Sequence, residues 1–139
     1  MGPVFIERNG LELAFLGYTD GLNQTGNDCP PPKAGAAQCL QAAELDCQAV
    51  EGQVRAAAAQ ADAAIVSLHW GIEYEQQPRE PDVALARRLA EAGALVVLGH
   101  HPHVLQPVEL YRRADGRTAV IAYSLGTSSP TSRATTCWA

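Results

Sequence analysis

Two short apolar segments separated by one helical segment constrain the fold of this chain more than any other feature. Residues 63–68 and 95–98 are almost free of polar side chains, which is typical of strands buried in a layered α/β core. Residues 81–92 between them predict a helix, which Gly93 ends. Strand, helix and strand over residues 63–98 make a βαβ unit, whose crossover is right-handed in nearly all proteins. The chain is therefore predicted to be an α/β protein.

More elements are predicted on both sides of this unit. An Asn-Gly dipeptide separates the first two of the added strands and an Asp-Gly dipeptide the last two, as in hairpins. Residues 42–60 predict a second helix, because they are rich in residues of high helix propensity. Residues 20–36, rich in Gly, Asn and Pro, predict a surface loop. The added strands are 4–7, 10–17, 107–111 and 118–124.

The length of 139 residues fits one domain of ~100–200 residues. We expect this domain to occupy residues 1–126, and we expect residues 127–139, which show no hydrophobic period, to be a divergent, disordered tail. The net charge of −5 offers no basic face for nucleic acid. The sequence contains neither a secretory signal nor a run of about 20 apolar residues that could span a bilayer.

All four histidines follow predicted strands. His69 comes after the first apolar segment, and the other three lie in the turn 99–103 after the second. Parallel strands end at a common edge of the sheet, where the sites of such proteins lie. Because residues two apart in extended backbone point the same way, and Pro102 favours extended backbone at His101, the sequence predicts that His101 and His103 aim at one point.

This histidine cluster indicates metal or anion binding. Neutral imidazole is the commonest metal ligand among side chains, and His69, His101 and His103 could hold one Zn²⁺ with an open position. A two-metal site would also need oxygen ligands, for which Glu73 is the best placed. Alternatives stay open, because a single histidine at a strand end is usually structural. Glu73 could equally be a solvated carboxylate or the partner of an arginine.

Other polar and aromatic residues near the histidines have two interpretations. Trp70, Glu73 and Tyr74 could wall a substrate pocket, although aromatic packing is the alternative for the two rings. Asp82 is expected to be a helix-start residue, and Glu109 to lie on the solvent face of its strand. The sequence contains no nucleophile elbow and no phosphate-binding loop.

The segments that carry these residues resemble the C-terminal part of the CapA family of poly-γ-glutamate capsule-synthesis proteins, within the calcineurin-like metallophosphatase superfamily. The most specific are the HWG–EY motif and the run GHHPHVLQ, and the resemblance spans roughly residues 4–126. The segments are NGLELAFLGY (9–18), SLHWGIEY (67–74), ARRLAEAG (86–93), GHHPHVLQPVE (99–109) and IAYSLG (121–126).

The resemblance implies a partial metallophosphatase-like β-sandwich flanked by helices. It implies that His69, His101 and His103 bind divalent metal ions (Mn, Zn or Fe) and that His100 is a catalytic neighbour that contacts substrate. The function implied is capsule synthesis or export at the cell surface, with metal-assisted phosphoester hydrolysis. Implied partners are an anionic polymer or a phosphate-containing small molecule, and capsule-assembly proteins at the membrane. The alternatives are a non-catalytic module that binds an anionic polymer or a partner, and an inert fragment.

Two departures from the family pattern matter. The segments that resemble the family's N-terminal metal-ligand loops are not found here, and the chain leaves the pattern after Gly126, where the family continues with Asn-Phe. We therefore expect a truncated or frameshifted form that holds only some of the metal ligands.

Overall fold

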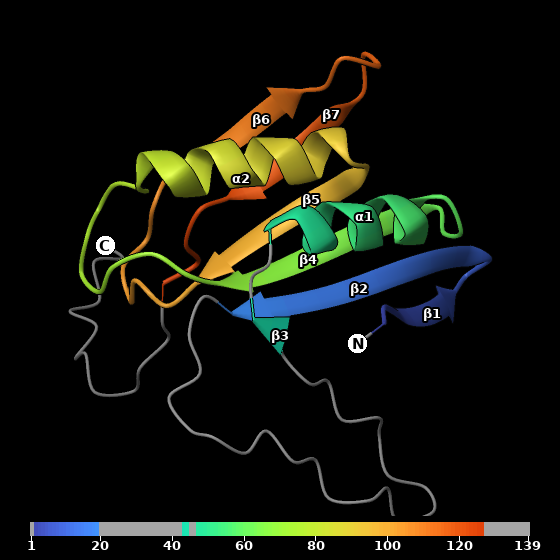
Figure 1. The fold of residues 1–139 in the computed structure, drawn as a ribbon, viewed down its shortest axis with the longest axis horizontal. Coiled ribbons are helices and arrows are strands. Elements are labelled where there is room, and N and C mark those ends of the chain that lie inside the picture. The colour runs from blue at the N-terminus through green and yellow to red at the C-terminus, as the bar shows by residue number, and fades with distance from the viewer. Residues whose placement is uncertain (1, 20–42, 45–46, 127–139) are drawn as a thin grey trace, which may run out of the picture.

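The computed structural model describes residues 2–19, 43–44 and 47–126. They form one sheet with two helices packed against the same face (Figure 1). None of the described helices is both long enough and apolar enough to cross a membrane. The helices are α1 (Cys47–Ala58) and α2 (Glu80–Glu91). The strands are β1 (Val4–Arg8), β2 (Leu11–Thr19), β3 (Ala43–Glu44), β4 (Ala63–His69), β5 (Ala94–His100), β6 (Val108–Arg112) and β7 (Thr118–Ala122).

The strand order is β1-β2-β4-β5-β7-β6, with β3 paired to β2. Strands β2, β4, β5 and β7 run parallel, while β1 and β6 are antiparallel partners at the two edges. The predicted strand, helix and strand over residues 63–98 are β4, α2 and β5. The α/β prediction is therefore confirmed, and the single sheet flanked by two helices agrees with the predicted partial fold.

The predicted helix over residues 42–60 is shorter in the structure. Ala43–Glu44 pairs with β2 instead, and α1 begins only at Cys47. The predicted loop at 20–36 and the predicted tail at 127–139 lie outside the described residues.

The core lies between the helices and one face of the sheet. Along β4, Val66 and Leu68 are fully buried, whereas Ile65 and Ser67 on the opposite face are only partly buried. This alternation differs from the burial on both faces that the apolar run predicted, because both described helices cover the same face. The residues that α1 and α2 contribute to this core are Val50, Val54, Ala57, Leu85, Ala86, Leu89 and Ala90.

Candidate metal centre

The loops that follow β4 and β5 are hydrogen-bonded to each other at the carboxyl edge of the sheet. The backbone N–H of Tyr74 donates to the Pro102 carbonyl at 2.8 Å. The side-chain amide of Gln106 donates to the Glu75 carbonyl at 2.9 Å, and Gln106 is 8% exposed. These bonds hold together two segments that are about thirty residues apart in the chain. The sequence offered no specific signal for Gln106.

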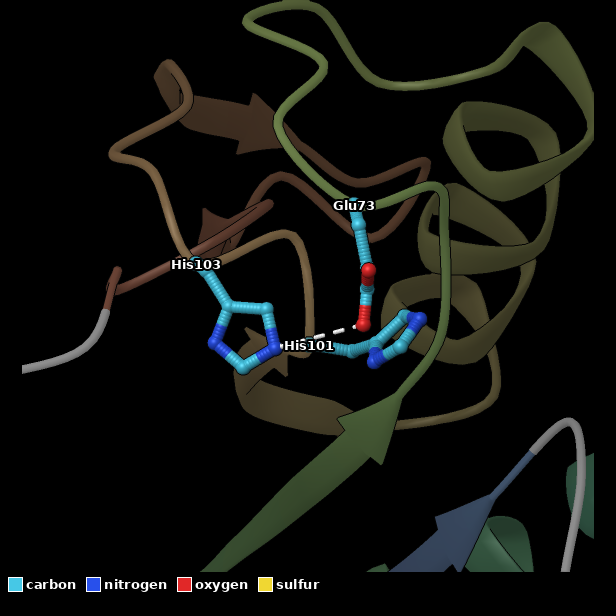
Figure 2. Close-up of side chains that lie close together, drawn as sticks. All are labelled: Glu73, His101 and His103. Carbon is cyan, nitrogen blue, oxygen red and sulfur yellow. Dashed lines mark ion pairs between the residues drawn. The ribbon is translucent and has the colours of Figure 1, made fainter. Parts of the chain in front are cut away.

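The joined loops bring Glu73, His101 and His103 together (Figure 2). Each offers one ligand atom, and these atoms all lie within 4.8 Å of one another. His103 Nε2 is 3.7 Å from Glu73 Oε1, and the two imidazole centroids are 5.7 Å apart. The side chains of His103 and Glu73 are 36% and 54% exposed. The cluster is therefore open to an ion from solvent.

The backbone around the cluster differs from the extended conformation that the sequence predicted. His101 has φ +99° and His103 has φ +61°, both in the left-handed region, and Tyr74 has φ +63°. The prediction of extended backbone at His101 is wrong, although the two imidazoles do converge. Gly71, at φ +86°, is the fourth such residue in these loops, and a Cβ there would lie 3.2 Å from Pro102 Cγ. The contacts between the loops therefore hold these residues in a backbone conformation that their residue types do not prefer.

His69 lies beside this cluster without belonging to the three-residue group. Its ring centroid is 4.5 Å from that of His101, and its Nδ1 is 3.5 Å from Thr19 Oγ1. His100 pairs in register with His69, so both side chains start from the same face of the sheet. A metal-binding role for His69 and a substrate-contacting role for His100 stay predictions.

Trp70 and Tyr74 lie in opposite environments. Trp70 is 1% exposed and donates its indole N–H to the Tyr123 carbonyl at 3.0 Å, so packing describes it better than a pocket wall. Tyr74 is 71% exposed, and its ring lies 6.0 Å from that of His103. Tyr74 is therefore accessible to a molecule that approaches the cluster.

The other acidic residues considered have structural partners. Asp82, in the first turn of α2, accepts two hydrogen bonds from Arg79, as expected of a helix-start residue. Glu109 is not on the solvent face, because it accepts hydrogen bonds from Arg87 and Tyr123. Desolvation alone would raise the pKa of the Glu109 carboxyl, but the bonds from Tyr123 and Arg87 outweigh it, so its pKa lies below the usual value.

Comparisons with known proteins identify relatives of this chain. The chain is 36% identical over 118 residues to the PGA biosynthesis protein CapA of Bacillus subtilis (strain 168), and 33% identical over 131 residues to the capsule biosynthesis protein CapA of Bacillus anthracis. These matches cover 85% and 88% of this chain. The chain spans only 28% of the length of either relative.

Two further comparisons cover different shares of the chain. A probable polyglutamine synthesis accessory protein of Mycobacterium tuberculosis (strain CDC 1551 / Oshkosh) is 44% identical over 63 residues, which are 45% of this chain and 17% of that protein. A hypothetical protein from Thermus thermophilus has a similar fold, with a TM-score of 0.52 and 20% identity over 90% of this chain and 38% of that chain. The family described as bacterial capsule synthesis protein PGA_cap matches residues 2–128, and the chain belongs to this family.

Proposed function

We propose that this chain carries part of a divalent-metal centre in a capsule-synthesis protein whose full form hydrolyses a phosphoester during the synthesis or export of poly-γ-glutamate. The observation that carries the proposal is the convergence of Glu73, His101 and His103 to within 4.8 Å. The capsule role is supported by family membership and by two relatives that are named for it. Because the chain spans 28% of those relatives, the activity is proposed for the full-length form.

The donor set suits the proposed cofactor. Two imidazole nitrogens and one carboxylate oxygen are ligands typical of Zn, Mn or Fe, whereas Ca²⁺ and Mg²⁺ prefer oxygen ligands alone. Glu73, His101 and His103 would hold the ion, and His69, with its ring 4.5 Å from that of His101, is proposed as a further ligand. Such an ion would polarise a phosphoryl oxygen and make bound water a nucleophile at neutral pH.

The residues around the donors are proposed to bind the substrate. Tyr74, 71% exposed beside His103, offers an aromatic surface to the organic part of a substrate. His100, at the end of β5, is proposed to contact the substrate. The proposed ligand is an anionic polymer or a phosphate-containing small molecule. We place the full-length protein at the cell surface with capsule-assembly partners, as the capsule relatives' names suggest.

Metal titration of the 139-residue chain tests the proposal. We expect isothermal titration with Zn²⁺ or Mn²⁺ to show binding. His101→Ala, His103→Ala and Glu73→Gln should each weaken it by at least the roughly 10–100-fold that loss of a group hydrogen-bonded to a ligand costs. Glu75→Gln is the control, since Glu75 is exposed and outside the cluster. Equal affinity in all four variants and the parent would rule out the assignment. Weaker binding by His69→Ala would make His69 a ligand.

The catalytic part of the proposal needs its own assay. Turnover of a phosphoester by the full-length protein, dependent on added Mn²⁺ or Zn²⁺ and lost in His101→Ala, would support hydrolysis. Polymer binding that survives a chelator, without turnover, would instead support the non-catalytic binding module.

A further inference from the structure

Trp70 lies in the chain between His69 and Glu73, yet its side chain is buried in the core. It follows His69 directly and is 1% exposed. Its backbone N–H donates to the His100 carbonyl at 3.1 Å, and its indole Nε1–H donates to the Tyr123 carbonyl at 3.0 Å. This one residue therefore ties the end of β4 to the end of β5 and to the residue that follows β7.

Gly99 leaves the space that this arrangement requires. A Cβ added at Gly99 would lie 2.6 Å from Trp70 Nε1 and 1.9 Å from the Tyr123 carbonyl oxygen, both far inside ordinary contact. The Gly99 carbonyl accepts a hydrogen bond from the Leu125 N–H at 3.0 Å. The Trp70 and Tyr123 rings are stacked, with centroids 6.5 Å apart and an interplanar angle of 16°. The end of β5 is therefore closely packed against the indole.

We propose that Trp70 is a positioning residue, which sets the distance between the loop that carries Glu73 and the loop that carries His101 and His103. The inference rests on the proposed metal function for the identity of what is positioned. Glu73 follows Trp70 by three residues, and His101 follows Gly99 by two. Because the indole starts at the end of β4 and packs against Gly99 at the end of β5, a smaller side chain without the N–H would let the starts of the two loops shift relative to each other.

Trp70→Phe in the 139-residue chain tests this role, with Tyr111→Phe as the matched control. Both substitutions remove one hydrogen bond from an aromatic side chain, but the Tyr111 hydroxyl bonds to Glu91 at the C-terminal end of α2, away from the histidines. Co²⁺ titration followed by visible absorption reports both affinity and ligand geometry. We expect Trp70→Phe to weaken Co²⁺ binding about tenfold and to alter the absorption bands, while Tyr111→Phe matches the parent.

A second measurement needs no metal. The His69 and His101 rings, with centroids 4.5 Å apart, should give a nuclear Overhauser effect in the parent and in Tyr111→Phe. Trp70→Phe should weaken this effect. If circular dichroism shows that Trp70→Phe does not fold, Trp70 can be replaced site-specifically by 3-benzothienylalanine. This residue keeps the bicyclic ring but lacks the N–H, and the same measurements are then made on that variant.

The two measurements separate this inference from the metal proposal. A parent chain that binds no Co²⁺ contradicts the metal proposal, while loss of the ring-to-ring effect in Trp70→Phe alone still supports the positioning role. An unchanged ring-to-ring effect together with unchanged Co²⁺ affinity and spectrum in Trp70→Phe overturns the role. Equal changes in Tyr111→Phe also overturn it, because they would reflect a general loss of stability.

Discussion

Several residues around the candidate metal centre have a backbone conformation that is unfavourable for their residue type. Tyr74, His101 and His103 all have positive φ, a conformation that costs a non-glycine residue on the order of 1–3 kcal/mol. The hydrogen bond from Tyr74 to Pro102 and the one from Gln106 to Glu75 oppose relaxation of these residues. These contacts between the loops hold Glu73, His101 and His103 close together, and a preformed arrangement of this kind reduces the ordering cost of ligand binding.

Gly71 gives a stability prediction at this scale. Gly71→Ala is expected to destabilise the fold by about 1–2 kcal/mol, because a side chain is strained at φ +86° and the new Cβ would press on Pro102 Cγ at 3.2 Å. Urea unfolding followed by circular dichroism measures the change. Gly52→Ala in α1 is the control with the opposite sign: a Cβ there meets nothing within 4 Å, and the helix should gain about 0.5–1 kcal/mol. Destabilisation of equal size in both would contradict the argument.

At the scale of elements, α2 is tied to its neighbours through charged side chains. Arg87 bonds to Glu109 on β6, and Glu91 accepts a hydrogen bond from Tyr111 on the same strand. Arg88 forms an ion pair with Glu51 on α1. Exposed pairs of this kind contribute little each, but Glu109 is half-buried and also accepts from Tyr123. Glu109 therefore anchors α2 and β7 to the edge strand β6.

This anchor predicts a pH dependence of stability. The folded-state pKa of Glu109 is lowered from the usual 4.5, so its contribution to stability is present above pH 4.5 and is lost as the pH falls through the folded pKa. We expect Glu109→Gln to lower the melting temperature near neutral pH and to flatten the fall of stability in acid. Thermal unfolding across this range, with the exposed carboxylate variant Glu7→Gln as control, measures both. If the melting temperature of Glu109→Gln falls in acid as much as that of the parent, Glu109 does not cause the acid dependence of stability.

The sequence predicted most elements and the convergence of His101 and His103, and its failures have physical causes. The unit over residues 63–98 was predictable because apolar runs and a helix stop are local signals. The open face of β4 was not predictable, because an apolar residue such as Ile65 in the sequence does not indicate whether another element covers its side chain. The left-handed backbone of His101 was missed because the Tyr74–Pro102 hydrogen bond joins distant segments, which overrides the preference that Pro102 imposes. For Glu73 the sequence left three roles open: a metal ligand, a solvated carboxylate or the partner of an arginine.

At the scale of the whole molecule, the sheet has one covered and one open face within the part of the chain that the structure describes. Both helices pack on the same face (Figure 1). On the other face, Leu110 of β6 pairs in register with Val120 of β7, and Val108 follows the same alternation. They are 72%, 36% and 62% exposed. Adjacent apolar side chains on a sheet edge favour association with another apolar surface.

We expect this open face to make the chain self-associate and bind a hydrophobic dye. The double substitution Val108→Thr and Leu110→Thr should reduce both, because threonine suits a strand but offers less apolar surface. Sedimentation velocity over a range of protein concentrations and dye fluorescence measure the effect. Leu105→Thr is the control, since Leu105 is 76% exposed but lies in a loop outside the named strands. A parent that is monomeric and does not bind the dye would contradict this expectation. If Leu105→Thr reduces association as much as the double variant, apolar exposure in the loops would explain association better than the open face of the sheet does.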